Sequence, residues 1–163
     1  MLVLTWVNNM SSLTQQMAAS PHGWIKINVD EATTKSLTVL AAVARDDNGI
    51  VIKVWSRTRS LLKLLLSYGL CYLQKLKFER WSHIIVEGDA KSCFDSLASP
   101  ASTPNFSIYY IISNILCFKE FIAGCIFLWV RRDCNLAAHA AAKFIPEALA
   151  AACKVDCFPF PSK

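Results

Sequence analysis

The sequence has little charge and lacks the short motifs that identify many common enzymes. Only 18% of its 163 residues are charged, whereas 54% are hydrophobic. It contains no C-x-x-C pair, no glycine-rich phosphate loop, no G-x-S-x-G elbow and no H-E-x-x-H motif. These absences exclude the usual signatures of P-loop nucleotide hydrolases, α/β-hydrolases and zinc metalloproteases.

The chain also lacks a clean apolar run of membrane-spanning length, although its mean hydropathy of +0.35 is high. The most apolar stretch, residues 109–130, is long enough to cross a bilayer. However, Lys119 and Glu120 lie at its centre, where each charge would cost about 2.5–3.5 kcal/mol. Because Gly124 then divides the stretch, we interpret it as a helix, a turn and a buried strand, and we expect no membrane partner.

A secretory signal is also missing, since no basic region precedes the apolar N-terminus. The seven cysteines are odd in number, and most lie in apolar, periodic segments. We therefore expect buried, reduced thiols in an intracellular protein, nuclear or cytoplasmic; a zinc site near Cys153 and Cys157 is the alternative. The net charge of +5 permits nucleic-acid binding without demonstrating it.

The hydrophobic pattern divides the chain into one domain and two tails. Residues 1–22 are interpreted as an N-terminal tail or linker, 23–147 as the domain and 148–163 as a C-terminal tail. Apolar alternation and apolar runs predict strands at about 24–30, 37–45, 50–57, 81–87 and 125–130. Helical spacing predicts helices at about 60–77, 90–98, 107–121 and 135–151.

This order of elements predicts an α/β fold. It gives a mixed five-stranded sheet, with three antiparallel strands followed by parallel ones and helices on both faces. The Asp46–Gly49 segment is a tight-turn signal between the second and third strands. In the first strand we expect the polar face, which carries Lys26, Asn28 and Asp30, to be exposed. The last strand, 125–130, is apolar on both faces and is expected to be covered on both.

Two aspartates lie at the ends of predicted strands. Asp30 ends the first strand and Asp89 follows the fourth, so a mixed sheet can bring their carboxylates together. Carboxylate oxygens suit Mg²⁺ and Mn²⁺, and two such ions can activate water for phosphodiester cleavage. Taken singly, each has a simpler interpretation: Asp30 as a solvated strand end, and Asp89 as the N-cap of the next helix.

Four segments, in sequence order, resemble those of one known family. They are residues 23–30 (GWIKINVD), 44–49 (ARDDNG), 84–89 (IIVEGD) and 130–140 (VRRDCNLAAHA). They resemble the first strand, hairpin, fourth strand and final helix of plant ribonuclease H type 1 domains, also called reverse-transcriptase-like domains. The resemblance implies an RNase H-like fold that binds nucleic acid and an endonuclease that hydrolyses the RNA strand of RNA–DNA hybrids with Mg²⁺ or Mn²⁺.

The resemblance also implies roles for individual residues. Asp30 and Asp89 fall on two catalytic, metal-binding aspartates. His139 falls where the wider family has a fourth acidic ligand and where plant members commonly have histidine. Asn135 falls on the family's asparagine at the start of the last helix, on the same helix face as His139.

The residues between the last strand and the last helix are candidates for binding nucleic acid. Arg131 and Arg132 are basic neighbours of the expected site, and Asn135 follows them. The two arginines are interpreted either as phosphate contacts or as the point where the chain returns to solvent. Trp129, which precedes them, is interpreted as a core residue and not as a platform for base stacking.

One departure from the family limits what can be inherited from it. The family has a glutamate at the start of its first long helix, and Leu62 occupies that position. No acidic residue occurs between Asp47 and Glu79, so a shift in alignment cannot supply one. Because leucine binds no metal, we expect hybrid cleavage to be weakened or absent unless Glu31 or Glu87 replaces the missing ligand.

Three interpretations of function therefore remain open. The first is an RNase H type 1 domain that binds RNA–DNA hybrid or duplex RNA and cleaves hybrid weakly or not at all. The second is a non-catalytic domain that binds nucleic acid or another protein. The third is a decayed fragment derived from a retroelement. In each case we expect a monomer.

Overall fold

The computed structural model describes residues 20–33, 37–60, 81–99 and 106–151. Most of the predicted helix at 60–77, including Leu62, lies outside the described residues, and its first residue, Ser60, ends a strand. Residues 1–19 and 152–163 of the two predicted tails also lie outside the described residues.

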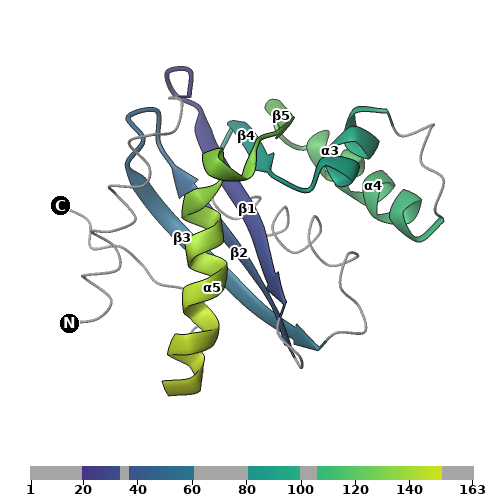
Figure 1. Ribbon diagram of the computed structural model, residues 1–163. Coiled ribbons are helices and arrows are strands. Elements are labelled where there is room, and N and C mark those ends of the chain that lie inside the picture. Colours follow the sequence, from purple (N-terminus) through teal and green to yellow (C-terminus); the bar gives the residue numbers. More distant parts are fainter. Residues whose placement is uncertain (1–19, 34–36, 61–80, 100–105, 152–163) are drawn as a thin grey trace.

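Within the described part of the chain, five strands form one sheet in the order β3-β2-β1-β4-β5 (Figure 1). Strand β2 is antiparallel to both β1 and β3, whereas β1 and β4, and β4 and β5, run parallel. The predicted mixed sheet is confirmed. The strands are β1 (Ile25–Thr33), β2 (Leu37–Arg45), β3 (Val51–Ser60), β4 (His83–Gly88) and β5 (Gly124–Trp129).

A tight turn joins β2 to β3 at the predicted place. The Asp46 carboxylate accepts hydrogen bonds from the backbone N–H groups of Asn48 (3.0 Å) and Ile50 (2.8 Å). Gly49 has a φ of +78°, a conformation that residues with a Cβ rarely adopt. The turn therefore depends on an aspartate at position 46 and a glycine at position 49, both of which the local sequence supplies.

Helices cover both faces of the sheet (Figure 1). Helix α5 (Leu136–Ala151) packs on β1, β2 and β3, and α3 (Lys91–Ala98) and α4 (Phe106–Lys119) lie on the other side. Alternate residues of β2 separate the two layers: Val43 packs with Ala141 of α5, while Ala42 shares a core cluster with Phe94 of α3. A 3₁₀ helix, η3 (Arg132–Cys134), precedes α5.

Helix α5 packs closely on the sheet because its inner face is made of alanines. Small side chains let the helix backbone approach the strands, and this approach brings the first turn of α5 within hydrogen-bonding distance of β1. The fully buried alanines of α5 are Ala137, Ala138, Ala141 and Ala142.

The polar face of β1 is not exposed as predicted. Lys26 and Asn28 are buried, because Asn135, at the start of α5, packs against this face of β1. Ile25 is partly accessible, and the far end of the strand, from Val29 onward, is partly accessible or exposed. The alternation of polar and apolar residues correctly indicated two different faces, but both faces are covered from Lys26 to Asn28.

Strand β5 is covered on one face only, so the expectation of burial on both faces is wrong. Cys125 belongs to the core on the α4 side, whereas Ile126 and Leu128 are 41% and 43% exposed. Because α5 packs on β1, β2 and β3, it leaves this face of the edge strand uncovered.

Asp89 is not the N-cap of the following helix. Ala90 holds the N-cap position of α3, and no side-chain hydrogen bond caps this helix. The backbone carbonyl of Asp89 accepts a hydrogen bond from the N–H of Lys91 (2.9 Å). The Asp89 carboxylate is therefore available for other contacts.

The cysteines of the described ranges, namely Cys93, Cys117, Cys125 and Cys134, are free thiols. Burial raises the pKa of the Cys125 thiol to about 11, which keeps it protonated. Cys117 and Cys134 are exposed, so the expected burial holds for only part of the set. Cys153 and Cys157 lie outside the described residues. None of the described helices is long and apolar enough to cross a membrane.

We predict that Ala141→Leu lowers the free energy of unfolding by about 1–3 kcal/mol, because it inserts three heavy atoms where α5 meets β2. Lys143→Leu is the matched control, since it introduces the same side chain on the exposed side of the same helix. Urea denaturation measures both variants. Equal effects of the two substitutions would contradict the close helix–sheet contact.

Candidate functional site

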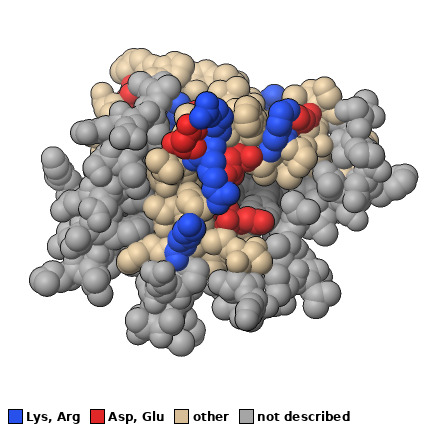
Figure 2. Space-filling model, viewed as in Figure 1, with Lys and Arg blue, Asp and Glu red and all other residues tan. Residues whose placement is uncertain are grey.

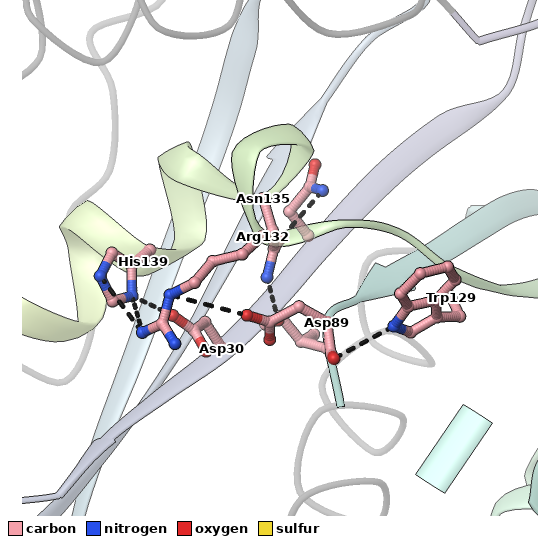
Figure 3. A network of polar contacts seen from close by, with 8 residues as sticks. Asp30, Asp89, Trp129, Arg132, Asn135 and His139 are labelled. Atoms are coloured by element: carbon pink, nitrogen blue, oxygen red, sulfur yellow. Dashed lines mark hydrogen bonds and ion pairs between the residues drawn. The ribbon is translucent and has the colours of Figure 1, made fainter. Parts of the chain in front are cut away.

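Strands β1 and β4 bring Asp30 and Asp89 to the same end of the sheet (Figure 3). The strands are parallel neighbours, and Val29 pairs with Gly88 in their register. Asp30 and Asp89 follow these two residues directly in the chain. The predicted adjacency of the two strands is confirmed, and with it the two carboxylates meet beside the start of α5.

Two aromatic residues fix the backbone around Asp89. A Cβ on Gly88 would lie 2.6 Å from the ring of Phe94, so a larger residue there would force the ring to move where α3 packs against β4. The indole N–H of Trp129 donates to the carbonyl of Asp89 (3.1 Å). Contrary to the prediction of a core position, Trp129 is 43% exposed, because it lies on the edge strand β5 next to the site.

Asn135 fixes the start of α5 to β1. Its side-chain Nδ2 donates to the carbonyl of Val29 (2.9 Å), and its Oδ1 accepts from Nδ2 of Asn28 (3.1 Å). Asn135 is fully buried. It was expected to contact nucleic acid, but both of its side-chain polar groups are already used inside the protein. We therefore assign it a positioning role.

Three charged side chains are buried around Asn28. The Glu87 carboxylate accepts from Nδ2 of Asn28 (3.0 Å) and pairs with Nζ of Lys26 (2.9 Å). Nη2 of Arg45 donates to Oδ1 of Asn28 (2.5 Å) and lies 3.9 Å from Glu87. Burial lowers the pKa of Arg45, and the negative charge of Glu87 opposes this shift. We call Lys26, Asn28, Arg45, Glu87 and Asn135 the Asn28 network.

The Asn28 network was not recognised from the sequence, although one signal was present. Lys26, Asn28 and Asp30 alternate along β1, which indicates a polar face but does not show what covers it. Glu87 was considered as a substitute metal ligand. Its pairing with Lys26 and Asn28 shows that it is instead committed to this buried network.

His139 lies one helical turn after Asn135 and contacts Asp30 (Figure 3). Its Nδ1 is 2.7 Å from Oδ2 of Asp30, and both side chains are largely buried. A ring protonated at Nδ1 donates to Asp30 and leaves the Nε2 lone pair as an acceptor. Asn135 therefore positions His139 indirectly, because it fixes the turn of α5 from which His139 projects.

Arg132 extends from η3 across the site (Figure 3). Its Nη2 lies 3.2 Å from Nδ1 and 3.4 Å from Nε2 of His139, and its Nε lies 4.0 Å from Oδ2 of Asp89. Arg131, the preceding residue, is paired with Asp133 at 3.2 and 2.8 Å. The two candidate arginines thus have different partners, and only Arg132 joins the two aspartates of the site.

Two carboxyl groups at this end of the sheet, those of Asp30 and Glu31, have raised pKa values. Burial raises the pKa of Asp30, and the hydrogen bond from His139 only partly opposes this shift. The pKa of the neighbouring Glu31 is also raised, first by burial and then by the negative charges of Asp30 and Asp89. When these acids are ionised, their negative charges lie close together, so a cation near this end of the sheet is favoured.

The described side chains do not fit the two-metal centre that the family resemblance implies. Mg²⁺ needs carboxylate oxygens that are free to coordinate it. Asp30 is hydrogen-bonded to His139, Asp89 faces Arg132, and Glu87 is held by Lys26. Across residues 20–33, 37–60, 81–99 and 106–151, no group of three or more His, Cys, Asp or Glu side chains is arranged to hold a metal ion. The position of Leu62 lies outside these ranges.

The described residues in Figure 2 form no broad patch of one charge. On this face, Lys and Arg side chains lie among Asp and Glu side chains over the described elements. A binding site for phosphates on this face would therefore depend on a few individual cations and not on a general positive potential.

The match to a known family covers most of the domain. Residues 28–145 match the family described as reverse transcriptase-like, and this range includes Asp30, Asp89, Arg131, Arg132, Asn135 and His139. The chain belongs to the reverse transcriptase-like family. No curated protein matches its sequence closely enough to be identified as a relative.

Solved structures with the same fold carry RNase H domains. RNase H1 from the halophilic archaeon Halobacterium salinarum is 16% identical, with a TM-score of 0.66 over 79% of this chain and 99% of that one. The N-terminal RNase H domain of rv2228c from Mycobacterium tuberculosis is 13% identical, with a TM-score of 0.65 over 78% and 96%. LC11-RNase H1, solved with an RNA/DNA hybrid, is 14% identical, with a TM-score of 0.64 over 77% and 99%. The chain therefore has the RNase H fold.

We predict that Asn135→Ala lowers the free energy of unfolding by about 1–3 kcal/mol, because it leaves the Val29 carbonyl without its partner and removes the acceptor for Asn28. Ser96→Ala is the control, since its hydroxyl bonds within the exposed part of α3. Thermal and urea unfolding compare the two variants. A loss no larger than that of Ser96→Ala would contradict the positioning role.

We predict that Asp30→Asn becomes more stable relative to the parent chain as the pH rises above the ordinary aspartate pKa of 3.8. The raised pKa means that the folded state holds this proton more tightly than the unfolded state. The stability contributed by Asp30 is therefore complete below pH 3.8. It is lost as the pH rises through the raised pKa that Asp30 has in the folded state. Urea denaturation at a series of pH values measures the difference. Asp95→Asn, on the exposed side of α3, is the control, and a constant difference for Asp30→Asn would contradict the assignment.

Proposed function

We propose that this domain binds RNA–DNA hybrid or duplex RNA as a monomer, and that it cleaves hybrid weakly or not at all. The observation that carries the proposal is the convergence of Asp30, Asp89 and His139 beneath the Arg132 guanidinium. The site has retained its place in the fold, but its carboxylates are occupied by side chains of the protein. The same fold in LC11-RNase H1 was solved with an RNA/DNA hybrid, which supports this class of ligand.

Phosphate binding is assigned to the two arginines before α5. Guanidinium groups form paired hydrogen bonds to phosphate oxygens, and both side chains are well exposed. Because both guanidinium groups are exposed beside the site, these two residues should supply much of the electrostatic attraction there. Contacts of this kind would recognise the backbone of a duplex and not its base sequence.

Weak or absent cleavage follows from the carboxylates. Metal-dependent hydrolysis needs several acidic ligands around the ions. Leu62 holds the position of the helix glutamate, Glu87 is paired with Lys26, and His139 is bound to Asp30. Each of these features removes a ligand from the set or engages it with another group.

A second candidate function is protein binding at the open face of β5. Ile126 and Leu128 are exposed there, next to the exposed Trp129. Apolar side chains grouped on a sheet edge are typical of contact surfaces. If this is the main function, Ile126→Lys will abolish capture of a protein partner and leave hybrid binding unchanged.

We predict that the chain binds a labelled RNA–DNA hybrid at low salt, and that its affinity falls steeply as salt is raised. Fluorescence anisotropy gives the slope of log affinity against log salt, which is negative. Its magnitude should fall by about one to two when Arg131 and Arg132 are both replaced by alanine. Lys53→Ala is the control, because Lys53 lies on β3 at the opposite edge of the sheet. Absence of binding at low salt would refute the proposal.

We predict no hybrid cleavage above that of Asp30→Asn, with either Mg²⁺ or Mn²⁺. A gel assay with end-labelled hybrid measures it, and a single cooperative unfolding transition must first show that both proteins are folded. Metal-dependent cleavage that Asp30→Asn abolishes would show a working catalytic site. A chain with no cooperative transition would instead support the decayed-fragment interpretation.

A further inference from the structure

We propose that the guanidinium of Arg132 is the resident cation of this site, and that it excludes a divalent metal ion from Asp30 and Asp89. The inference has a second part, that the domain binds phosphates through Arg132 without needing Mg²⁺, and this part rests on the proposed function. The first part, the exclusion of a divalent metal ion, rests only on contacts within the chain.

The Arg132 side chain lies between Asp89 on one side and the His139–Asp30 pair on the other. Its Nε lies 4.0 Å from the carboxylate of Asp89, and its Nη2 lies 3.2 Å from His139, which is bound to Asp30 at 2.7 Å. One side chain thus connects both aspartates, directly on one side and through an imidazole on the other (Figure 3). These are the oxygen atoms that a divalent ion would need.

The charge at this end of the sheet explains why a cation is retained. Asp30 and Asp89 follow paired residues of adjacent strands, and Glu31 comes directly after Asp30 in the chain. Like charges that share a partly buried site repel one another, and a nearby positive group offsets this repulsion. A guanidinium cannot lose its proton at ordinary pH, so Arg132 supplies this positive charge permanently.

Arg132 also remains available to a ligand from outside. Its side chain is 66% exposed although it contacts both sides of the site. A guanidinium has five N–H donors in a fixed plane, and the contacts with His139 and Asp89 leave others for phosphate oxygens. The same group can therefore neutralise the carboxylates and contact a nucleic-acid backbone.

The neighbouring arginine provides a matched comparison. Arg131 has the same charge and a similar exposure, but its guanidinium is paired with Asp133. Removing either arginine changes the net charge of the protein by the same amount. Only the removal of Arg132 uncovers the carboxylate of Asp89 and the ring of His139.

The test measures Mn²⁺ binding by isothermal titration calorimetry, with free Mn²⁺ followed independently by its electron paramagnetic resonance signal. We expect Arg132→Ala to bind Mn²⁺ about tenfold or more tightly than the parent chain, since a positive charge about 4 Å from the ligand oxygens is gone. Arg131→Ala should stay within about twofold of the parent under the same Coulomb estimate, because Asp133 already pairs its charge. Adding Asp89→Asn to Arg132→Ala should remove the gain.

Three results would overturn the inference. They are tight Mn²⁺ binding by the parent chain, equal gains in the two arginine variants, and no gain in Arg132→Ala. Circular dichroism and the unfolding transition confirm that each variant is folded. The metal measurement needs no nucleic acid, so its outcome is independent of whether the chain binds hybrid.

A second measurement tests the part that depends on the proposed function. Hybrid affinity is compared in EDTA and in Mg²⁺ at matched ionic strength, for the parent chain and for Arg132→Ala. Equal affinities of the parent in the two buffers, with a loss in Arg132→Ala, support a metal-free contact. Binding by the parent that requires Mg²⁺ would refute this part, whereas no binding in either buffer would refute the proposed function itself.

Discussion

The packing of α5 on the sheet depends on whether the polar groups of β1 beneath it find hydrogen-bond partners. An amide buried without partners costs about 1–3 kcal/mol, and Asn28 is fully buried. Its three neighbours, Glu87, Asn135 and Arg45, come from β4, the start of α5 and β2. Because one side chain joins four elements, the strand order and the position of the helix are fixed together. The site lies at the end of this arrangement, since His139 is one turn beyond Asn135.

Much of this arrangement could be predicted from the sequence, because strand patterns are local. Alternation and turn residues indicated the strands, and Asp30 and Asp89 were placed at strand ends that proved to be neighbours. What covers each face could not be predicted in the same way. Polar residues on β1 suggested an exposed face, yet Asn135, more than a hundred residues later in the chain, buries that face. Burial of a polar residue depends on partners that no local pattern contains.

The same reasoning explains the two errors around β5. An apolar run indicates a strand but does not show whether it is central or at an edge, and β5 is at the edge. Ile126 and Leu128 are therefore exposed, and Trp129 lies beside the site instead of inside the core. The roles of Arg131 and Arg132 were equally beyond sequence reasoning. The two residues are identical in type, and only the direction of each side chain from η3 separates a pair with Asp133 from a bridge across the site.

The distribution of charge at the site is the basis of the proposed binding function. In a metal-dependent nuclease, the acidic side chains coordinate the metal ions. In this chain, Lys26 neutralises Glu87, His139 is bound to Asp30, and Arg132 faces Asp89. Burial already raises the pKa of Asp30, so an ionised Asp30 depends on these neighbouring groups. A loss of the helix glutamate would weaken metal binding, and a site without metal would be stabilised by an internal cation. The Arg132 guanidinium thus places, beside Asp89, positive charge of the kind that a metal ion would otherwise supply.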